Sequence, residues 1–147
     1  MDILHQGMLA IGLSACAGLR AWLPLLGVGL LSRWGYIPLD GSFQILQSDP
    51  ALLTFGIATI IEVMADKVVV LDNLLDSLGT VLRPIAGTVV AAGMFTSLDP
   101  TLQAILGIVL GGGTAFTVHA GKAALRGGTT ALAPAHGGFL NACISLL

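Results

Sequence analysis

The sequence is poor in charged and in aromatic residues, and this scarcity decides its broad class. Charged residues are only 10% of the 147-residue chain and aromatic residues only 5%. Ordinary soluble domains carry about 25% charged residues, whereas here hydrophobic residues make up 55% and the mean hydropathy is +0.93. The net charge of −2 gives no sign of a nucleic-acid partner. We therefore expect an all-α integral membrane protein that forms one multi-pass domain over residues 1–147 within the lipid bilayer.

Cysteines and the motifs of soluble enzymes are also scarce. Cys16 and Cys143 stand alone without CxxC spacing, which argues against a redox motif or a zinc site. The chain contains no phosphate-binding loop, no dinucleotide fingerprint and no hydrolase or metalloprotease signature. We expect neither an enzyme nor a bound cofactor.

Long hydrophobic runs are abundant and predict four or five transmembrane helices. The first run covers residues 7–31, and a second helix starts at Asp49-Pro50. An amphipathic helical segment over 68–78 separates the second helix from a third run over 81–98. The fourth run is 101–121, and a final run over 129–147 either spans the membrane or only dips into it.

The first run has a polar interruption at its centre. Arg20 lies in the middle of the run, Gly18 precedes it, and Pro24 leaves the Arg20 carbonyl without its helical N–H donor. This combination predicts an interrupted first helix with polar backbone facing the protein interior. Arg20 is then a structural counter-ion for Glu62 or Asp66, a substrate-binding residue, or both.

Acidic residues gather in the segment 61–76, after an uncharged run that begins at Ala51. The run 51–61 is too short to cross a bilayer at about 1.5 Å per residue, so a spanning helix carries Glu62 into or near the hydrocarbon. A charge at that depth costs about 2.5–3.5 kcal/mol, so the side chain must face protein or water. Glu62 and Asp66 share one helix face. Two carboxylates at such a short separation repel each other and require a cation, a shared proton or a basic partner.

This segment is the predicted ion- or substrate-binding site. The residues assigned to it are Glu62, Asp66, Lys67, Arg20, Asp72, Asn73 and Asp76. Carboxylates bind protons and hard cations such as Ca²⁺, Mg²⁺ or Mn²⁺, so Glu62 and Asp66 are the candidate metal ligands, with Lys67 and Arg20 as compensating charges. The favoured hypothesis is a cation or proton transporter or channel. The alternative is a non-transporting membrane scaffold or assembly factor whose buried ion pairs only fix the helix packing.

Basic residues form a second group with a different predicted role. His119, Lys122 and Arg126 follow one another at helical spacing on one face, and Arg83 opens the third run. These four residues are candidates for contacts with an anion or a lipid headgroup. They are also the possible partners of the acidic group in a structural ion network.

Glycines mark the fourth run. Gly107, Gly111 and Gly113 provide small-residue ridges that allow another helix to approach closely. Such ridges serve packing within one chain or between two copies, and we expect a homo-oligomer that uses these three glycines. A flexible break that lines a conduction path is the other interpretation.

The placement of Lys and Arg predicts the topology. With five spans, Lys67, Arg83, Lys122 and Arg126 share one side of the membrane with the N-terminus, and Arg33 lies on the other. The positive-inside rule then predicts a cell (inner) membrane protein with a cytoplasmic N-terminus.

Several motifs together carry a family resemblance over most of the chain. They are Ser14-x-x-x-Gly18-Leu19-Arg20-Ala21-Trp22-Leu23-Pro24-Leu25, Glu62-Val-Met-Ala-Asp66-Lys67, Leu71-Asp72-Asn73-Leu74-Leu75-Asp76, Leu82-Arg83-Pro84-x-Ala86-Gly87 and His119-x-x-Lys122-Ala123-x-x-Arg126. As a set they resemble the membrane family catalogued as domain of unknown function 4126. The resemblance implies a small multi-helix membrane protein of bacterial type and carries no activity with it.

One motif is also similar to a signature of known transporters. Glu62-Val-Met-Ala-Asp66-Lys67 resembles the Glu-x-Gly-Asp-Lys/Arg signature of a family of manganese and calcium transporters. The spacing here is one residue longer, the glycine is missing, and the chain has one such motif where those transporters carry two. The similarity implies only a class of ligand to test.

Overall fold

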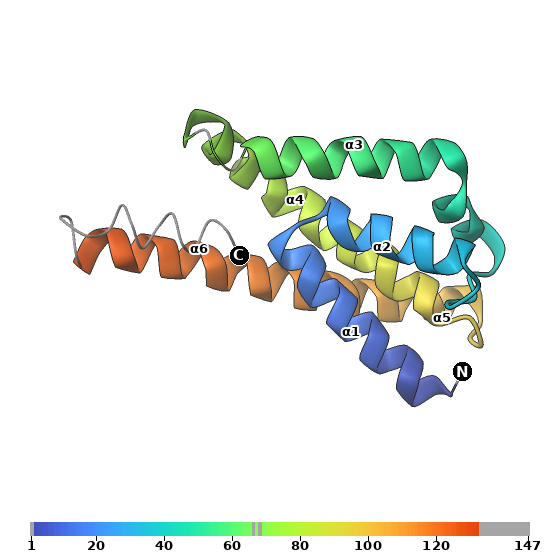
Figure 1. Ribbon diagram of the computed structural model, residues 1–147. Helices are drawn as coiled ribbons and strands as arrows, with labels where there is room; N and C mark the ends of the chain where they lie inside the picture. The colour runs from blue at the N-terminus through green and yellow to red at the C-terminus, as the bar shows by residue number, and fades with distance from the viewer. Residues whose placement is uncertain (1, 66, 68, 133–147) are drawn as a thin grey trace.

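The computed structural model describes the backbone of residues 2–65, 67 and 69–132, and the side chains of these residues except 69–76 and 126–132. Every element in this part of the chain is helical, as predicted (Figure 1). In order they are α1 (Ile3–Leu19), α2 (Trp22–Arg33), the 3₁₀ helix η1 (Gly41–Gln47), α3 (Asp49–Ala65), α4 (Val69–Met94), α5 (Pro100–Leu106), the π-helix η2 (Gly107–Gly112) and α6 (Gly113–Leu132). Helices suit a bilayer because they satisfy their backbone polar groups internally.

The chain reverses direction between α1 and α2, so the two helices form a hairpin (Figure 1). At the start of α1, the side chain of Gln6 donates a hydrogen bond to Thr96 Oγ1 (3.4 Å), next to the C-terminal end of α4. After α2, the ring of Phe43 lies against Gly93 near that same end of α4. The hairpin therefore enters and leaves the bundle at one end, which we call the Thr96 end. The turn between α3 and α4 marks the opposite end, which we call the Lys67 end.

The interrupted first helix is confirmed, and the run 7–31 forms two helices instead of one continuous helix. The separate helices Ile3–Leu19 and Trp22–Arg33 fold back on each other, and each is shorter than a spanning helix. In the described part of the chain, two helical stretches are long and apolar enough to span, Ser77–Met94 and Pro100–Leu125. A third span results if η1 and α3, which meet at an angle of 60°, count as one. The count of four or five spans is not confirmed, and most of the final run lies outside the described residues.

The hairpin predicts which positions share a side of the membrane. We expect single cysteines introduced at Asp2 and Ser97 to react with an impermeant maleimide from one side, and a cysteine at Lys67 from the other. The background chain carries serine at Cys16 and Cys143, and site-directed labelling in sealed vesicles makes the measurement. Labelling of positions 2 and 67 from the same side would support the five-span topology and contradict the hairpin.

Two sequence segments that we expect to be separate belong to one helix. The amphipathic segment 68–78 and the third run 81–98 are both part of α4, which continues through Pro84. A proline inside a helix removes one backbone hydrogen bond, and polar side chains in a membrane helix often compensate. The carbonyl that loses its helical donor is that of Thr80, and Thr88 Oγ1 adds a hydrogen bond to the Pro84 carbonyl itself at 2.9 Å. At the start of α5, Asp99 caps the helix by accepting from the Thr101 N–H at 3.0 Å, and Pro100 occupies the first turn.

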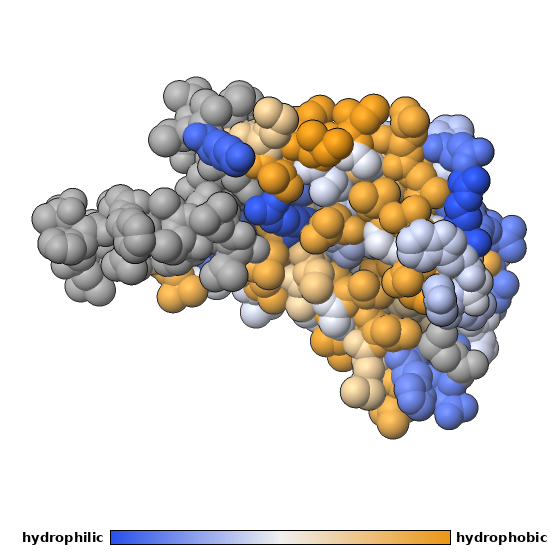
Figure 2. Space-filling view, in the orientation of Figure 1, coloured by the Kyte–Doolittle hydropathy of each residue, from blue (hydrophilic) through white to orange (hydrophobic). Residues whose placement is uncertain are grey.

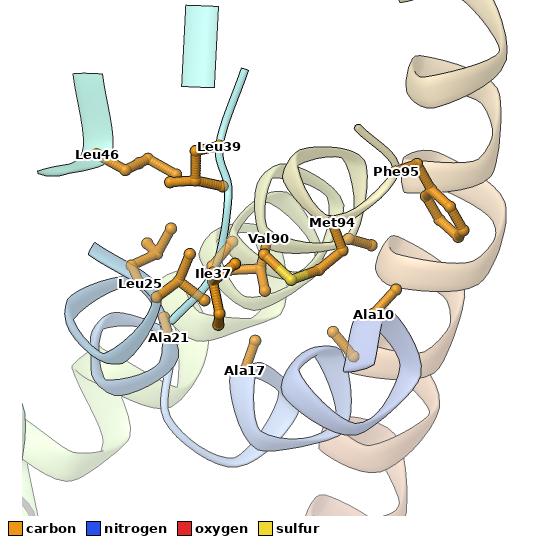
Figure 3. Packing of buried hydrophobic residues seen from close by; sticks show 14 residues of the cluster. Ala10, Ala17, Ala21, Leu25, Ile37, Leu39, Leu46, Val90, Met94 and Phe95 are labelled. Atoms are coloured by element: carbon orange, nitrogen blue, oxygen red, sulfur yellow. The ribbon is translucent and has the colours of Figure 1, made fainter. Parts of the chain in front are cut away.

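Small residues bring α1 against α4. Ala10 and Ala17 of α1 and Val90 of α4 are completely buried, and Figure 3 shows Ala17 directed toward Val90. Ser14 lies between the two alanines on the same face and donates to the Gly87 carbonyl of α4 at 3.1 Å. Lipid gives no hydrophobic driving force between helices, so close packing and interhelical hydrogen bonds of this kind hold them together.

The glycines of η2 allow an equally close approach to α4. A Cβ at Gly107 would lie 2.7 Å from Ala92 Cβ, and a Cβ at Gly111 would overlap the Gly87 carbonyl. This corrects the assignment of Gly107 and Gly111 to an interface between two copies, because both are buried within one chain. Gly113 is exposed, and a Cβ at that position would have no described atom within 4 Å. The homo-oligomer itself stays a prediction.

Large apolar side chains cover the outside of the bundle. On α3 alone, Leu53, Ile57, Ile60 and Met64 are each more than half exposed. Figure 2 shows an orange apolar surface over the helices and hydrophilic residues gathered on the right, at the Thr96 end. An apolar surface of this extent indicates contact with lipid and is consistent with a location in a membrane.

Candidate functional site

The break between α1 and α2 creates a helix N-terminus inside the bundle. Arg20 has an extended backbone (φ −142°, ψ 119°), which ends α1, and the new helix starts at Trp22. Pro24 falls in the first turn of α2. The N–H groups of a first turn have no carbonyl acceptor within the helix, so the N–H that proline lacks costs no helical hydrogen bond. Gly18 permits the turn to sit against α6, because a Cβ there would lie 2.5 Å from the Ala115 carbonyl oxygen. The first N–H groups of α2 therefore point at neighbouring helices rather than at water.

Glu62 of α3 accepts these N–H groups. Its Oε1 accepts a hydrogen bond from the Ala21 N–H at 3.1 Å, and the Trp22 N–H also interacts with the carboxylate. The N-terminus of a helix carries a partial positive charge, so a carboxylate is stabilised there. Glu62 is only 7% exposed although it lies near the apolar surface of α3. A side chain 41 positions away in sequence thus caps the returning helix of the hairpin.

Two arginines neutralise this carboxylate. The charges of Arg83 on α4 and of Arg20 at the break both act on Glu62 through space. Arg83 is 4% exposed, and Gly79 makes room for its guanidinium, which would lie 3.0 Å from a Cβ at that position. Figure 2 shows a hydrophilic patch within the orange surface, close to where α1 ends and α2 begins in Figure 1. The predicted role of Arg20 as a counter-ion for Glu62 agrees with this geometry.

His119 of α6 continues the polar cluster beyond Arg83. The Arg83 guanidinium contacts His119 Nδ1, and Thr80 Oγ1 lies 3.3 Å from His119 Nε2. A guanidinium can only donate, so Nδ1 is the acceptor and neutral His119 carries its proton on Nε2, facing Thr80. His119 is 6% exposed and Lys122, next on this face of α6, is 8% exposed. We call Glu62, Arg20, Arg83, His119 and Thr80 the polar cluster.

The burial of the basic residues bears on their predicted role. Arg83 and His119 were candidates for lipid-headgroup contacts, but their contacts lie inside the bundle with each other and near Glu62. Lys122 is buried as well, while the side chain of Arg126 is outside the described residues. The geometry therefore favours a charge network between helices over a headgroup site for Arg83 and His119.

The predicted acidic group is only partly visible. Glu62 is central, but Asp66 and the side chains of Asp72, Asn73 and Asp76 lie outside the described residues. Lys67 is exposed in the turn after α3, and the cations acting on Glu62 are Arg83 and Arg20. The predicted compensation by Lys67 also concerns Asp66, which lies outside the described residues, so it stays a prediction.

A metal site is not apparent in the part of the chain that the structure describes. No three His, Cys, Asp or Glu side chains gather there closely enough to hold an ion. Glu62, the first predicted ligand, faces two backbone N–H groups and two arginines, which are poor neighbours for a cation. The second predicted ligand, Asp66, lies outside the described residues, so the metal site stays a prediction.

Sequence reasoning missed several polar residues that connect the helices. Ser14 bonds α1 to α4, Thr80 contacts His119, and Gln6 accepts from Ser97 Oγ at 3.1 Å as well as donating to Thr96. Ser14 and Thr80 are only weakly hydrophilic, so the hydropathy pattern barely distinguishes them from residues facing lipid, and Gln6 lies just before the first predicted run. The signal that was present is the position of Ser14 one turn before Gly18, on the same face as the small residues of α1.

Comparisons with known proteins give one finding. A family model described as "Domain of unknown function (DUF4126)" matches residues 8–147, which confirms the resemblance carried by the motifs. Neither the comparison with curated proteins nor that with solved structures found a match.

Proposed function

Since the chain belongs to the family of the domain of unknown function 4126, whose description names no activity, we propose a function from the site: a membrane transporter or channel that carries protons through Glu62. The observation that carries the proposal is a buried carboxylate held at the N-terminus of a helix inside the bundle. Discontinuous helices of this kind form the ion and substrate sites of many transporters.

The state of the two carboxylate oxygens supports a proton as the ion. Glu62 Oε1 is engaged by the Ala21 N–H, whereas Oε2 is buried and has no hydrogen-bond partner among the described residues. A buried oxygen without a donor is a place where a proton can be taken up, because the protonated form no longer needs charge solvation. A metal ion would need more oxygen ligands than this one carboxylate provides, and no group of three His, Cys, Asp or Glu side chains gathers among the described residues.

Protonation of Glu62 would also act on the hairpin. The bond from the Ala21 N–H to a charged carboxylate is charge-assisted, and such bonds are roughly twice as strong as neutral ones. Neutral Glu62 holds the N-terminus of α2 less firmly and leaves Arg83 and Arg20 less compensated. In this mechanism α2 moves relative to α3 when the proton binds, and His119 and Thr80 extend the polar path toward the Lys67 end.

A scaffold is the second candidate, and one observation favours it. The same bond between Glu62 Oε1 and the Ala21 N–H caps α2 and joins α3 to the hairpin, which is a sufficient structural reason for a buried glutamate. In that case the polar cluster fixes the helix arrangement for a protein partner, and no ion moves.

Proton flux into liposomes separates the two candidates. We expect purified protein in vesicles with an internal pH-sensitive dye to carry protons when a membrane potential is imposed. The Glu62→Gln variant keeps an acceptor oxygen for the Ala21 N–H but no longer binds a proton, so its flux should fall to the level of empty vesicles. Asp99→Asn is the matched control, because it makes the same chemical change at the exposed cap of α5, where asparagine caps equally well.

Two results would reject the proton proposal. One is the absence of flux above empty vesicles for the wild-type protein, which would leave the scaffold. The other is equal flux for the wild-type and Glu62→Gln proteins, which would place the ion path away from Glu62.

We propose a revised membrane orientation, which the arrangement of the helices supports. The five-span topology puts the N-terminus and Lys67 on one side, whereas the N-terminus lies at the Thr96 end. Lys67 and Lys122 lie toward the Lys67 end, as do the last turns of α6. Arg33, the last residue of α2, lies at the Thr96 end. Applied to this arrangement, the positive-inside rule puts the Lys67 end in the cytoplasm and the N-terminus outside an inner membrane.

A further inference from the structure

A cavity among the described residues lies away from the polar cluster, at the Thr96 end. It has a volume of about 510 Å³ and lies between the start of η1, α4 and the helix formed by α5 and η2. Ligand sites in proteins measure roughly 300–1,000 Å³, so the cavity is large enough for part of an organic molecule. No step of the proposed proton path uses it.

The cavity is polar at one end and apolar at the other. Asp40 and Ser42 line it beside Pro100, at the level where α5 begins. Val89 and Ile108 line it about two helical turns deeper, counted along α4 from Thr96, and Ile108 is 61% exposed to the lipid-facing surface. The cavity therefore runs from the end of the bundle down its apolar side.

The polar end lies at the depth of lipid headgroups. Trp34 and Tyr36 follow α2 at the same end and are 66% and 71% exposed. Exposed Trp and Tyr residues at the ends of membrane helices mark the interface between hydrocarbon and water. Asp40 comes four residues after Tyr36, so its carboxylate is placed to contact a headgroup while the apolar part of the cavity faces acyl chains.

Charge decides which headgroup fits. Acidic residues at the Thr96 end are Asp2, Asp40, Asp49 and Asp99. The one arginine of this end, Arg33, already pairs with Asp49, and neither Lys nor Arg is among the cavity-lining residues. An anionic lipid is repelled by this end, whereas an amine is attracted to Asp40. Gln103, at mid-depth in the cavity, uses its amide N–H on the Phe95 carbonyl at 2.7 Å and leaves its own oxygen as an acceptor.

We propose that this cavity is a binding site for a phospholipid with a primary amine headgroup, of the phosphatidylethanolamine class. The ammonium group contacts Asp40, and one acyl chain lies against Val89, Ala104 and Ile108. The site is independent of Glu62 and of proton transport, and it places a lipid between η1 and α5, where it can hold these two elements together at the Thr96 end.

Native mass spectrometry of the detergent-solubilised protein tests the proposal. The probes are phosphatidylethanolamine and phosphatidylglycerol with identical acyl chains, titrated separately. We expect the ethanolamine lipid to bind more tightly, and Asp40→Asn to weaken it by roughly two- to fivefold, the range for an exposed ion pair. Ala104→Trp fills the cavity and should weaken binding by about tenfold or more.

Ala120→Trp is the control, because Ala120 is exposed on α6 away from the cavity and receives the same side chain. Selective binding that Asp40→Asn and Ala104→Trp reduce, and Ala120→Trp leaves unchanged, supports the site. Equal affinity for the two lipids overturns the headgroup assignment. Binding that survives Ala104→Trp, or that falls equally in Ala120→Trp, overturns the cavity as its location.

Discussion

Replacing Gly111 by alanine is expected to lower the free energy of unfolding by about 3 kcal/mol. The added Cβ would overlap the Gly87 carbonyl of α4 and lie 2.5 Å from Ala91 Cβ. A backbone carbonyl cannot move aside as the tip of a flexible side chain can. The variant therefore has to separate η2 from α4 and lose much of the packing between them.

Gly113→Ala is the matched control on the same helix, two residues away. Among the described residues, no atom outside its own helix turn lies within 4 Å of a Cβ at Gly113, and alanine favours a helix over glycine by up to about 1 kcal/mol. Unfolding in mixed micelles by a denaturing detergent measures both variants. We expect a large loss for Gly111→Ala and no loss for Gly113→Ala. Equally small changes in stability for Gly111→Ala and Gly113→Ala would mean that η2 does not pack closely against α4.

The π-helix explains why these glycines could not be assigned from spacing alone. Gly107 and Gly111 stand at the separation that typically marks an interface between two membrane helices, and Gly113 falls off that face. Spacing identifies the face but does not identify the partner. In the structure the widened turn of η2 places Gly107, Gly111 and Gly112 all against α4 of the same chain.

The first helix shows the same limit in another form. Gly18, Arg20 and Pro24 predict a break, because each disfavours an uninterrupted apolar helix. The break can therefore be predicted from these neighbouring residues alone. Whether the chain continues or turns back after the break depends on contacts with distant segments. Gln6 with Thr96 and Ala21 with Glu62 are such contacts, and neither is visible in the sequence.

The candidate site was predicted in part for a clear reason. The burial of Glu62 follows from its position after an apolar run, and Arg20 is a cation at the middle of another apolar run. Its closest partner was missed because backbone N–H groups have no sequence signature. Only the new helix beginning at Trp22 makes the Ala21 N–H available as a donor.

The second large effect is expected at this bond. Glu62→Ala removes both the acceptor for the Ala21 N–H and the charge that compensates Arg83 and Arg20. Removing one partner of a buried charge pair typically costs about 3–5 kcal/mol, because the other charge stays buried without compensation. We expect a loss of this size for Glu62→Ala, measured by the same detergent unfolding.

Glu62→Gln divides the loss between its two causes. Its amide oxygen still accepts from the Ala21 N–H, so the variant loses the charge but keeps the cap, and we expect a loss of about 1–2 kcal/mol. Met64→Ala, on an exposed position of the same helix, should change stability by less than about 0.5 kcal/mol. If Glu62→Ala were no more destabilising than Met64→Ala, the hairpin would not depend on this cap. A different result would be that Glu62→Gln keeps the wild-type stability and loses proton flux. That result would mean that the ion requires the carboxylate, whereas the fold requires only the hydrogen bond that caps α2.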